Sequence, residues 1–128
     1  MSEEVIPDEY HGWWRITNTE TWVNDGLDLL GPAYISLTGD DDRLRMHCLI
    51  AHVDPYSTKT GVSFFWRGAW EYDEMNGSGS VRLCRDGRLQ GTIKIKNGDS
   101  SGFTAERDGE PNEPIHDPPS YRDKWRRW

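Results

Sequence analysis

Apolar and polar residues alternate along the middle of the chain with a period of two, the pattern of strands buried on one face. Aromatic and β-branched residues are frequent in the same stretches, and these residues favour strands. No stretch between Trp13 and Arg107 has a helical period, and only 27–30 leaves room for a short helical turn. We therefore predict seven strand segments, which are 13–22, 33–38, 43–53, 61–70, 79–85, 88–96 and 101–107.

Short turns between these segments predict how the strands are connected. Asp86-Gly87 separates two segments by only two residues, and this pair suits a tight hairpin turn. Asn97-Gly98 gives the same signal before the last segment. Because such short links force antiparallel neighbours, the chain predicts an all-β, antiparallel up-and-down meander. A single open sheet would expose its apolar face to solvent, so the meander must close into a barrel or fold into a sandwich.

Alternation also predicts which side chains face the interior. The first segment contributes Trp14 and Ile16, followed by Asn18, Glu20 and Trp22. The later segments contribute mainly apolar residues to the same interior. These are Ala33, Ile35, Leu37, Leu44, Met46, Cys48, Ile50, Val62, Phe64, Trp66, Val81, Leu83, Leu89, Gly91, Ile93, Ile95, Phe103 and Ala105.

Three polar residues, Asn18, Glu20 and His52, fall on this predicted inner face. A buried charge or amide is costly unless it is paired. Glu20 and His52 both lie late in segments that run in the same direction, so we expect them at the same end of a closed ring. Glu20 could lie at the rim in water or pair with an Arg. The two residues could instead orient a ligand in an apolar cup, or act as a catalytic acid and base.

Composition and charge narrow the class of protein. The chain has 128 residues, a length that suits one domain. Its apolar share of 34% is low, but 7 Trp, 5 Tyr and 3 Phe supply a large apolar area. The net charge of −7 argues against general binding to nucleic acid. No apolar run reaches the length of about 18 residues that a membrane span needs.

The two ends differ in composition from the middle. We expect a flexible acidic arm over 1–10, a single β-barrel domain over 11–107, and a tail over 108–128 that is Pro-rich and then basic and aromatic. The first residues include no apolar stretch typical of a signal peptide, so we expect a cytoplasmic protein. Cys48 and Cys84 are then expected to be reduced.

The run Gly12-Trp13-Trp14 at the opening of the first strand resembles the G-x-W signature of the lipocalin, or calycin, barrels. In that family the motif Trp packs across the closed end of the barrel, and an Arg late in the last strand lies against it. The resemblance implies these roles for Trp14 and Arg107. It also implies a ring of eight strands or more, so an eighth strand is expected within 23–32 or after Arg107.

The wider pattern is similar to a family of short, uncharacterised bacterial proteins. The matching stretches are 12–22, 27–37 and 98–103, so the resemblance covers most of the predicted domain. It implies a β-barrel and no particular activity.

The sequence lacks the residue patterns that are typical of several kinds of functional site. His47-Cys48 with His52 does not have a standard zinc spacing, and Asp40-Asp41-Asp42 lacks the pattern of a calcium loop. The chain contains neither a G-x-S-x-G nucleophile motif nor a phosphate-binding glycine loop. We therefore assign no catalytic residue, metal or cofactor.

The leading functional prediction is non-enzymatic binding of a small, largely apolar ligand in the barrel cup. The first alternative is a protein–protein interaction module with a filled interior, acting through the rim, the acidic loops or the tail. The second is an enzyme that uses Glu20 with His52. The ligand-binding prediction assigns contact area to Trp22, Met46, Phe64 and Trp66, and a polar anchor to Glu20 and His52.

Overall fold

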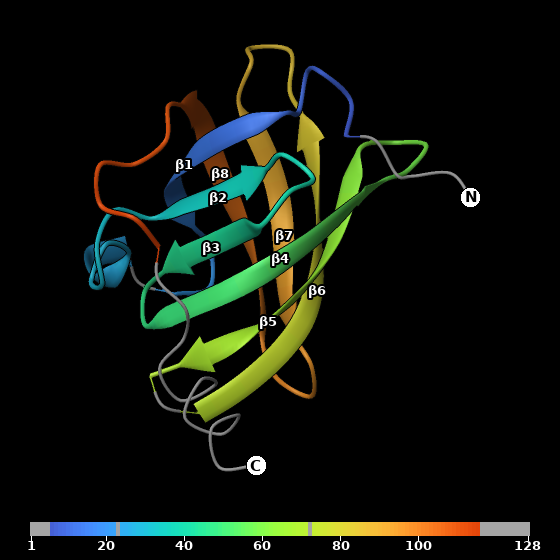
Figure 1. The fold of residues 1–128 in the computed structure, drawn as a ribbon. Helices are drawn as coiled ribbons and strands as arrows, with labels where there is room; N and C mark the ends of the chain where they lie inside the picture. Colours follow the sequence, from blue (N-terminus) through green and yellow to red (C-terminus); the bar gives the residue numbers. More distant parts are fainter. Residues whose placement is uncertain (1–5, 23, 72, 116–128) are drawn as a thin grey trace.

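Eight antiparallel strands form a closed barrel in which each strand pairs with the next along the chain and β8 pairs with β1 (Figure 1). This computed structural model describes residues 6–22, 24–71 and 73–115. The all-β barrel predicted from the alternation and the turns is confirmed. The strands are β1 (Gly12–Thr19), β2 (Tyr34–Leu37), β3 (Asp42–Met46), β4 (Leu49–Ser57), β5 (Val62–Trp70), β6 (Asp73–Leu83), β7 (Leu89–Ile95) and β8 (Ser100–Asp108).

Helical structure is confined, in the described part of the chain, to the short 3-10 turn η1 (Asn24–Gly26) between β1 and β2. No helix among the described residues has the length and apolar character needed to cross a membrane. The first strand opens at what we call the entry end of the barrel, where the chain also leaves β8. The opposite end, which holds the β1–β2, β3–β4, β5–β6 and β7–β8 connections, is called the far end.

The eighth strand comes from segment 43–53, which folds as two strands and not as one. β3 ends at Met46, His47 takes a left-handed φ of 53°, and β4 begins at Leu49. The expected locations for an extra strand are therefore wrong. The β1–β2 connection holds η1, and the residues described after β8 form no strand. His-Cys is not a usual turn pair, so the sequence gives little sign of this reversal.

The His47 turn changes which side chains of β4 face inward. The inward positions are Leu49, Ala51 and Val53, which are at most 7% exposed. Cys48, Ile50 and His52 are only half-buried. Their predicted inward positions are wrong, because one missed turn moves every later side chain of the segment to the other face.

A β-bulge in β1 has the same effect on the end of that strand. Ile16 pairs with Ala105 of β8, but the next pairs are Asn18 with Thr104 and Thr19 with Phe103, so one residue is skipped. Thr19 therefore takes the inward position and is 4% exposed. The predicted inward positions of Asn18 and Glu20 are wrong, because a bulge inserts one extra residue and reverses the alternation.

The entry end is closed by the segment that precedes β1. Ile6 and Tyr10 are buried in the core, and the Trp14 indole N–H donates to the Tyr10 carbonyl at 2.9 Å. The Arg107 guanidinium lies 4.4 Å from the centre of the Trp14 ring, so the contact implied by the lipocalin resemblance is present. Gly12 has a φ of 132°, where glycine is strongly favoured. Residues from Ile6 onward are thus packed on the barrel.

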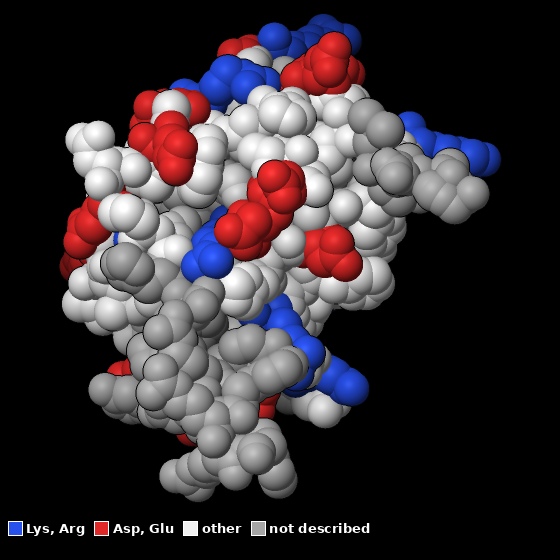
Figure 2. Space-filling model, in the orientation of Figure 1, with Lys and Arg blue, Asp and Glu red and all other residues white. Residues whose placement is uncertain are grey.

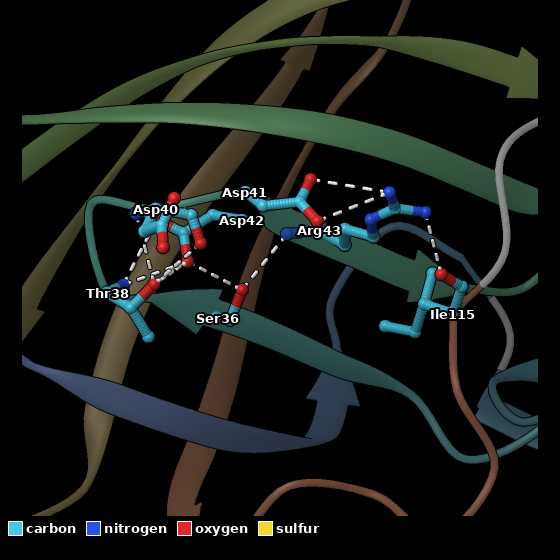
Figure 3. Close-up of polar contacts among 7 residues, drawn as sticks. All are labelled: Ser36, Thr38, Asp40, Asp41, Asp42, Arg43 and Ile115. Atoms are coloured by element: carbon cyan, nitrogen blue, oxygen red, sulfur yellow. Dashed lines mark hydrogen bonds and ion pairs between the residues drawn. The ribbon is translucent and has the colours of Figure 1, made fainter.

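A strap of residues 109–115 crosses the outer face of β2 and β3. The Arg45 side chain is buried beneath it and donates hydrogen bonds to the carbonyls of Pro32, Glu113 and Pro114. Arg43 donates to the Ile115 carbonyl at 2.9 Å (Figure 3). The strap therefore covers one side of the barrel. The residues of the predicted basic and aromatic stretch, 121–128, lie outside the described part of the chain.

Acidic and basic side chains are interspersed over the described residues on the face shown in Figure 2. The negative charge of the chain is thus not gathered into a single patch on that face. A mixed surface of this kind gives little long-range steering of charged partners, so recognition there would depend on local features.

Candidate functional site

The predicted cup residues Met46, Phe64 and Trp66 face the interior, where each is at most 2% exposed. The rings of Phe64 and Trp66 fill space that neighbouring glycines leave free. A Cβ on Gly79 would lie 2.3 Å from the Phe64 ring, and one on Gly77 would lie 2.9 Å from the Trp66 ring. The two rings thus pack against β6, and all three side chains belong to the core. Their contact with a ligand stays a prediction.

Glu20 and His52 do not form the predicted polar pair. Glu20 follows β1, is exposed, and lies over Gly102 on the outside of β8, where an added Cβ would be 2.6 Å from its Oε1. His52 lies in β4, between Arg43 of β3 and Arg67 of β5. Glu20 lines one outer hollow and His52 lines another, so the two residues share no cavity.

The far end carries an aromatic cluster that includes one predicted site residue, Trp22. Its ring lies 5.5 Å from Trp70 and 5.8 Å from His47, and His47 stacks on Trp70 at 6.2 Å. The Nε2 atom of His47 is 3.3 Å from the Thr19 hydroxyl. Neither His47 nor Trp70 was predicted as a site residue, and the turn that brings His47 to this end has no clear signal in the sequence.

The thiol beside this cluster is poorly suited to nucleophilic chemistry. Burial, together with the charge of Glu71, raises the pKa of Cys48. The thiolate is the reactive form of cysteine, and a raised pKa favours the less reactive thiol form of Cys48. Both Cys48 and Cys84 are free thiols.

Protonation of His47 is expected to make stability depend on pH. Burial lowers the pKa of His47, against opposing effects of a hydrogen bond with the Gly26 backbone and of the Asp28 charge. In the unfolded chain a histidine has a pKa of about 6.5, so the unfolded chain binds a proton at His47 more readily than the folded chain does. We expect the free energy of unfolding to fall as the pH is lowered from 7 through this value toward 5.

The test is urea unfolding of wild type and His47→Asn at several pH values. Asn tolerates the left-handed backbone of this position, so the turn should be kept. The variant is expected to lose part of the slope between pH 7 and 5, whereas the same change at the exposed His11 is expected to preserve it. An unchanged slope in His47→Asn would contradict this account.

The outer face of β5, β6 and β7 carries a hollow beside an exposed aromatic ring. Phe65 of β5 is 56% exposed and stacks on Tyr56 of β4, with ring centres 5.4 Å apart. In register, Phe65 pairs with Ser78 of β6, and Ser78 pairs with Lys94 of β7. We call this hollow the Phe65 groove. It has a volume of about 370 Å³ and is lined by Phe65, Asn76, Gly77, Ser78, Lys94, Ile95 and Lys96.

A second hollow of about 680 Å³ continues the groove toward β4. It shares Phe65, Asn76 and Gly77 with the first and adds His52 and Arg67. The predicted site residue His52 thus lines an outer surface and not the cup. Together the two hollows extend over four neighbouring strands with Phe65 between them.

One signal for this groove was present in the sequence. Alternation places Phe64 and Trp66 inward, so Phe65 between them must point outward. A large aromatic residue at an outward position is the kind of feature that marks a binding surface. The hollow itself could not be predicted, because it depends on small residues in β6 that lie in register with Phe65.

Comparison of the chain with protein-family models, curated proteins and solved structures found no match. Within residues 6–22, 24–71 and 73–115, no group of three or more His, Cys, Asp and Glu side chains is placed to hold a metal ion.

Proposed function

We propose that this protein is a non-enzymatic interaction module, with a filled barrel, whose partner protein binds in the Phe65 groove. The observation that carries the proposal is the exposure of Phe65, 56%, beside a hollow on a sheet face. Of the large hydrophobic side chains that the structure describes, only Leu29, Leu30 and Phe65 are exposed. Phe65 differs from the two leucines because it lies on a strand and lines two hollows.

The physical argument concerns what an exposed ring gains on binding. Covering a Phe side chain contributes about 1.5–3 kcal/mol, and aromatic anchors of this kind dominate many protein interfaces. β5 is hydrogen-bonded on both sides, to β4 and to β6, so the ring is held on a rigid element. A rigid anchor loses little conformational entropy when a partner binds, which favours affinity.

A small apolar ligand remains a second candidate, at the far end of the barrel. The observation that favours it is a set of side chains that pack against the core yet stay partly exposed. These are Trp22, Trp70, Met75 and Ile95. A ligand bound there would cover the apolar surface that these side chains leave open.

The barrel type and the cellular location belong to the same proposal. A calycin relationship is supported by the Trp14–Arg107 contact at the entry end and by the eight-stranded meander. A cytoplasmic location is supported by the two free thiols, Cys48 and Cys84.

The test is selection of peptides from a random library displayed on phage, followed by affinity measurement on three purified proteins. We expect peptides selected on wild type to lose about tenfold or more in affinity for Phe65→Thr, because the loss of this ring removes the anchor. Leu29→Thr, which removes another exposed apolar side chain far from the groove in sequence, is the matched control and should bind as wild type does.

Two results would overturn the proposal. One is that the library gives no peptide that binds wild type specifically. The other is that the selected peptides bind Phe65→Thr and wild type equally well while both proteins give the same thermal unfolding midpoint.

A further inference from the structure

The Phe65 groove has one aromatic wall and one basic wall, and we infer that its occupant is a protein segment with carboxylates beside an aromatic or aliphatic side chain. This inference rests on the proposed function and adds the chemical class of the partner. Phe65 forms the wall on β5, and Lys94 of β7 forms the opposite wall together with Lys96, which directly follows that strand.

The floor between the walls consists of small residues of β6. Asn76, Gly77 and Ser78 line it, and none carries a long side chain. Neighbouring strands lie about 4.8 Å apart, so walls on β5 and β7 are separated by roughly 10 Å. That width suits an extended peptide segment that inserts a side chain between the walls. The neighbouring hollow of about 680 Å³ gives the segment room to continue toward β4.

The basic wall is available for a carboxylate. Lys94 and Lys96 are exposed, and neither has a carboxylate partner among the described residues. Lys94 lies near the end of β7 and Lys96 lies in the turn directly after it, and both line the same groove. The two neighbouring ammonium groups make this part of the surface positive, although the whole chain has a net charge of −7.

The floor supplies further hydrogen-bond donors. The Ser78 hydroxyl and the Asn76 side-chain amide have no hydrogen-bond partner within the described part of the chain. Each can donate to a carboxylate oxygen, as can the two ammonium groups. An anionic group such as a carboxylate therefore matches this set of donors better than a cationic group does.

The acidic residues Asp54 and Glu74 line the neighbouring hollow, and no acidic residue lines the Phe65 groove itself. Asp54 of β4 pairs with Phe65 in register, so it is on the opposite side of the ring from Lys94. Glu74 lies at the start of β6 and lines the neighbouring hollow. The arrangement thus orients a partner, with its carboxylates toward β7 and its apolar side chain against Phe65.

A single-stranded nucleic acid is the other anionic partner that an aromatic ring and two lysines could bind. The observations favour a protein segment. The groove has two cations on a chain whose net charge of −7 repels a polyanion, and it presents one ring for stacking. Nucleic acid is therefore an outcome that the experiment must separate.

The experiment measures fluorescence anisotropy of four labelled probes with the full chain. Three are short peptides with Glu-Phe-Glu, Gln-Phe-Gln or Lys-Phe-Lys at the centre, and the fourth is a single-stranded RNA decamer. We expect the acidic peptide to bind about tenfold more tightly than the neutral one, and this advantage to shrink as salt is added. The basic peptide should bind more weakly than the neutral one.

A charge-reversal variant tests the basic wall directly. Lys94→Glu with Lys96→Glu is expected to reverse the order, so that the basic peptide binds more tightly than the acidic one. The matched control is Lys59→Glu with Arg85→Glu, two exposed residues in the turns at the entry end. This control changes the net charge equally and should keep the wild-type order.

The outcomes separate this inference from the proposed function. If all three peptides bind equally and all lose affinity in Phe65→Thr, the acidic partner is wrong and the interaction module stands. If peptide binding does not respond to Phe65→Thr, both are wrong. If the RNA binds more tightly than the acidic peptide and loses affinity in Phe65→Thr, the groove is a nucleic-acid site and the inference is overturned.

Discussion

Replacing Trp14 with Ala is expected to lower the free energy of unfolding by about 3–5 kcal/mol. The side chain is fully buried, and its removal would leave a cavity at the entry end of the core. The same change removes the indole donor to the Tyr10 carbonyl and the ring under the Arg107 guanidinium. Since small domains are stable by only about 5–15 kcal/mol, this loss is a large part of the total.

The measurement is urea unfolding followed by far-ultraviolet circular dichroism. Trp13→Ala is the matched control, because Trp13 is the neighbouring residue but lies half-buried on the outer face, in edge contact with Tyr34. We expect a clearly smaller loss for the control. Equal losses for the two variants would contradict the assignment of Trp14 as the residue that holds the entry end together.

Replacing Asp42 with Ala is expected to cost about 3 kcal/mol, because it removes a buried acceptor that several donors share. The Asp42 carboxylate is the acceptor for the hydroxyls of Ser36 and Thr38, at 2.8 and 2.7 Å (Figure 3). It also accepts the backbone N–H groups of Thr38 and Gly39. The residue is 3% exposed, so water would not readily replace these contacts.

Asp40→Ala serves as the matched control for this variant. Asp40 lies in the same turn and is exposed, so its replacement is expected to change the free energy of unfolding by no more than about 0.5 kcal/mol. Denaturant midpoints of the two variants decide the matter. A loss for Asp42→Ala no larger than that for Asp40→Ala would show that the carboxylate does not hold the β2–β3 turn.

The barrel could be predicted because its main signals are local. Asp86-Gly87 marks a hairpin by its own chemistry, and Phe64 and Trp66 are assigned inward by simple alternation. In the structure β6 and β7 do form a hairpin and the two rings are buried in the core. The predicted two-residue link is wrong, because β6 ends at Leu83 and β7 begins at Leu89. The fold class could thus be predicted from the local preference of the chain for strands, without information on tertiary contacts.

The polar pair was wrong because two local irregularities carry no clear sequence signal. His47 adopts a left-handed conformation that is usual for Gly or Asn, and it moves His52 to the outer face. The bulge in β1 is a matter of pairing with β8, and it moves Glu20 outside. The alternation of apolar and polar residues cannot reveal the turn or the bulge, because the pattern continues on both sides of each. Only the face to which the later side chains point has changed.

The groove illustrates a different limit. That Phe65 points outward follows from the sequence, but the depth beside it depends on which residues of β6 and β7 stand in register with it. Register between strands is set by tertiary pairing and by turns. The same applies to Arg45, whose burial beneath the strap depends on carbonyls about 70 residues away, as at Pro114.

The most direct test of the account is amide-resolved NMR of the labelled protein titrated with the Glu-Phe-Glu peptide. We predict that the largest chemical-shift changes fall on Phe65, on Asn76 to Ser78 and on Lys94 to Lys96, because these residues line the groove. Changes concentrated instead at the indole groups of Trp22 and Trp70 would contradict the central claim and place binding at the far end of the barrel.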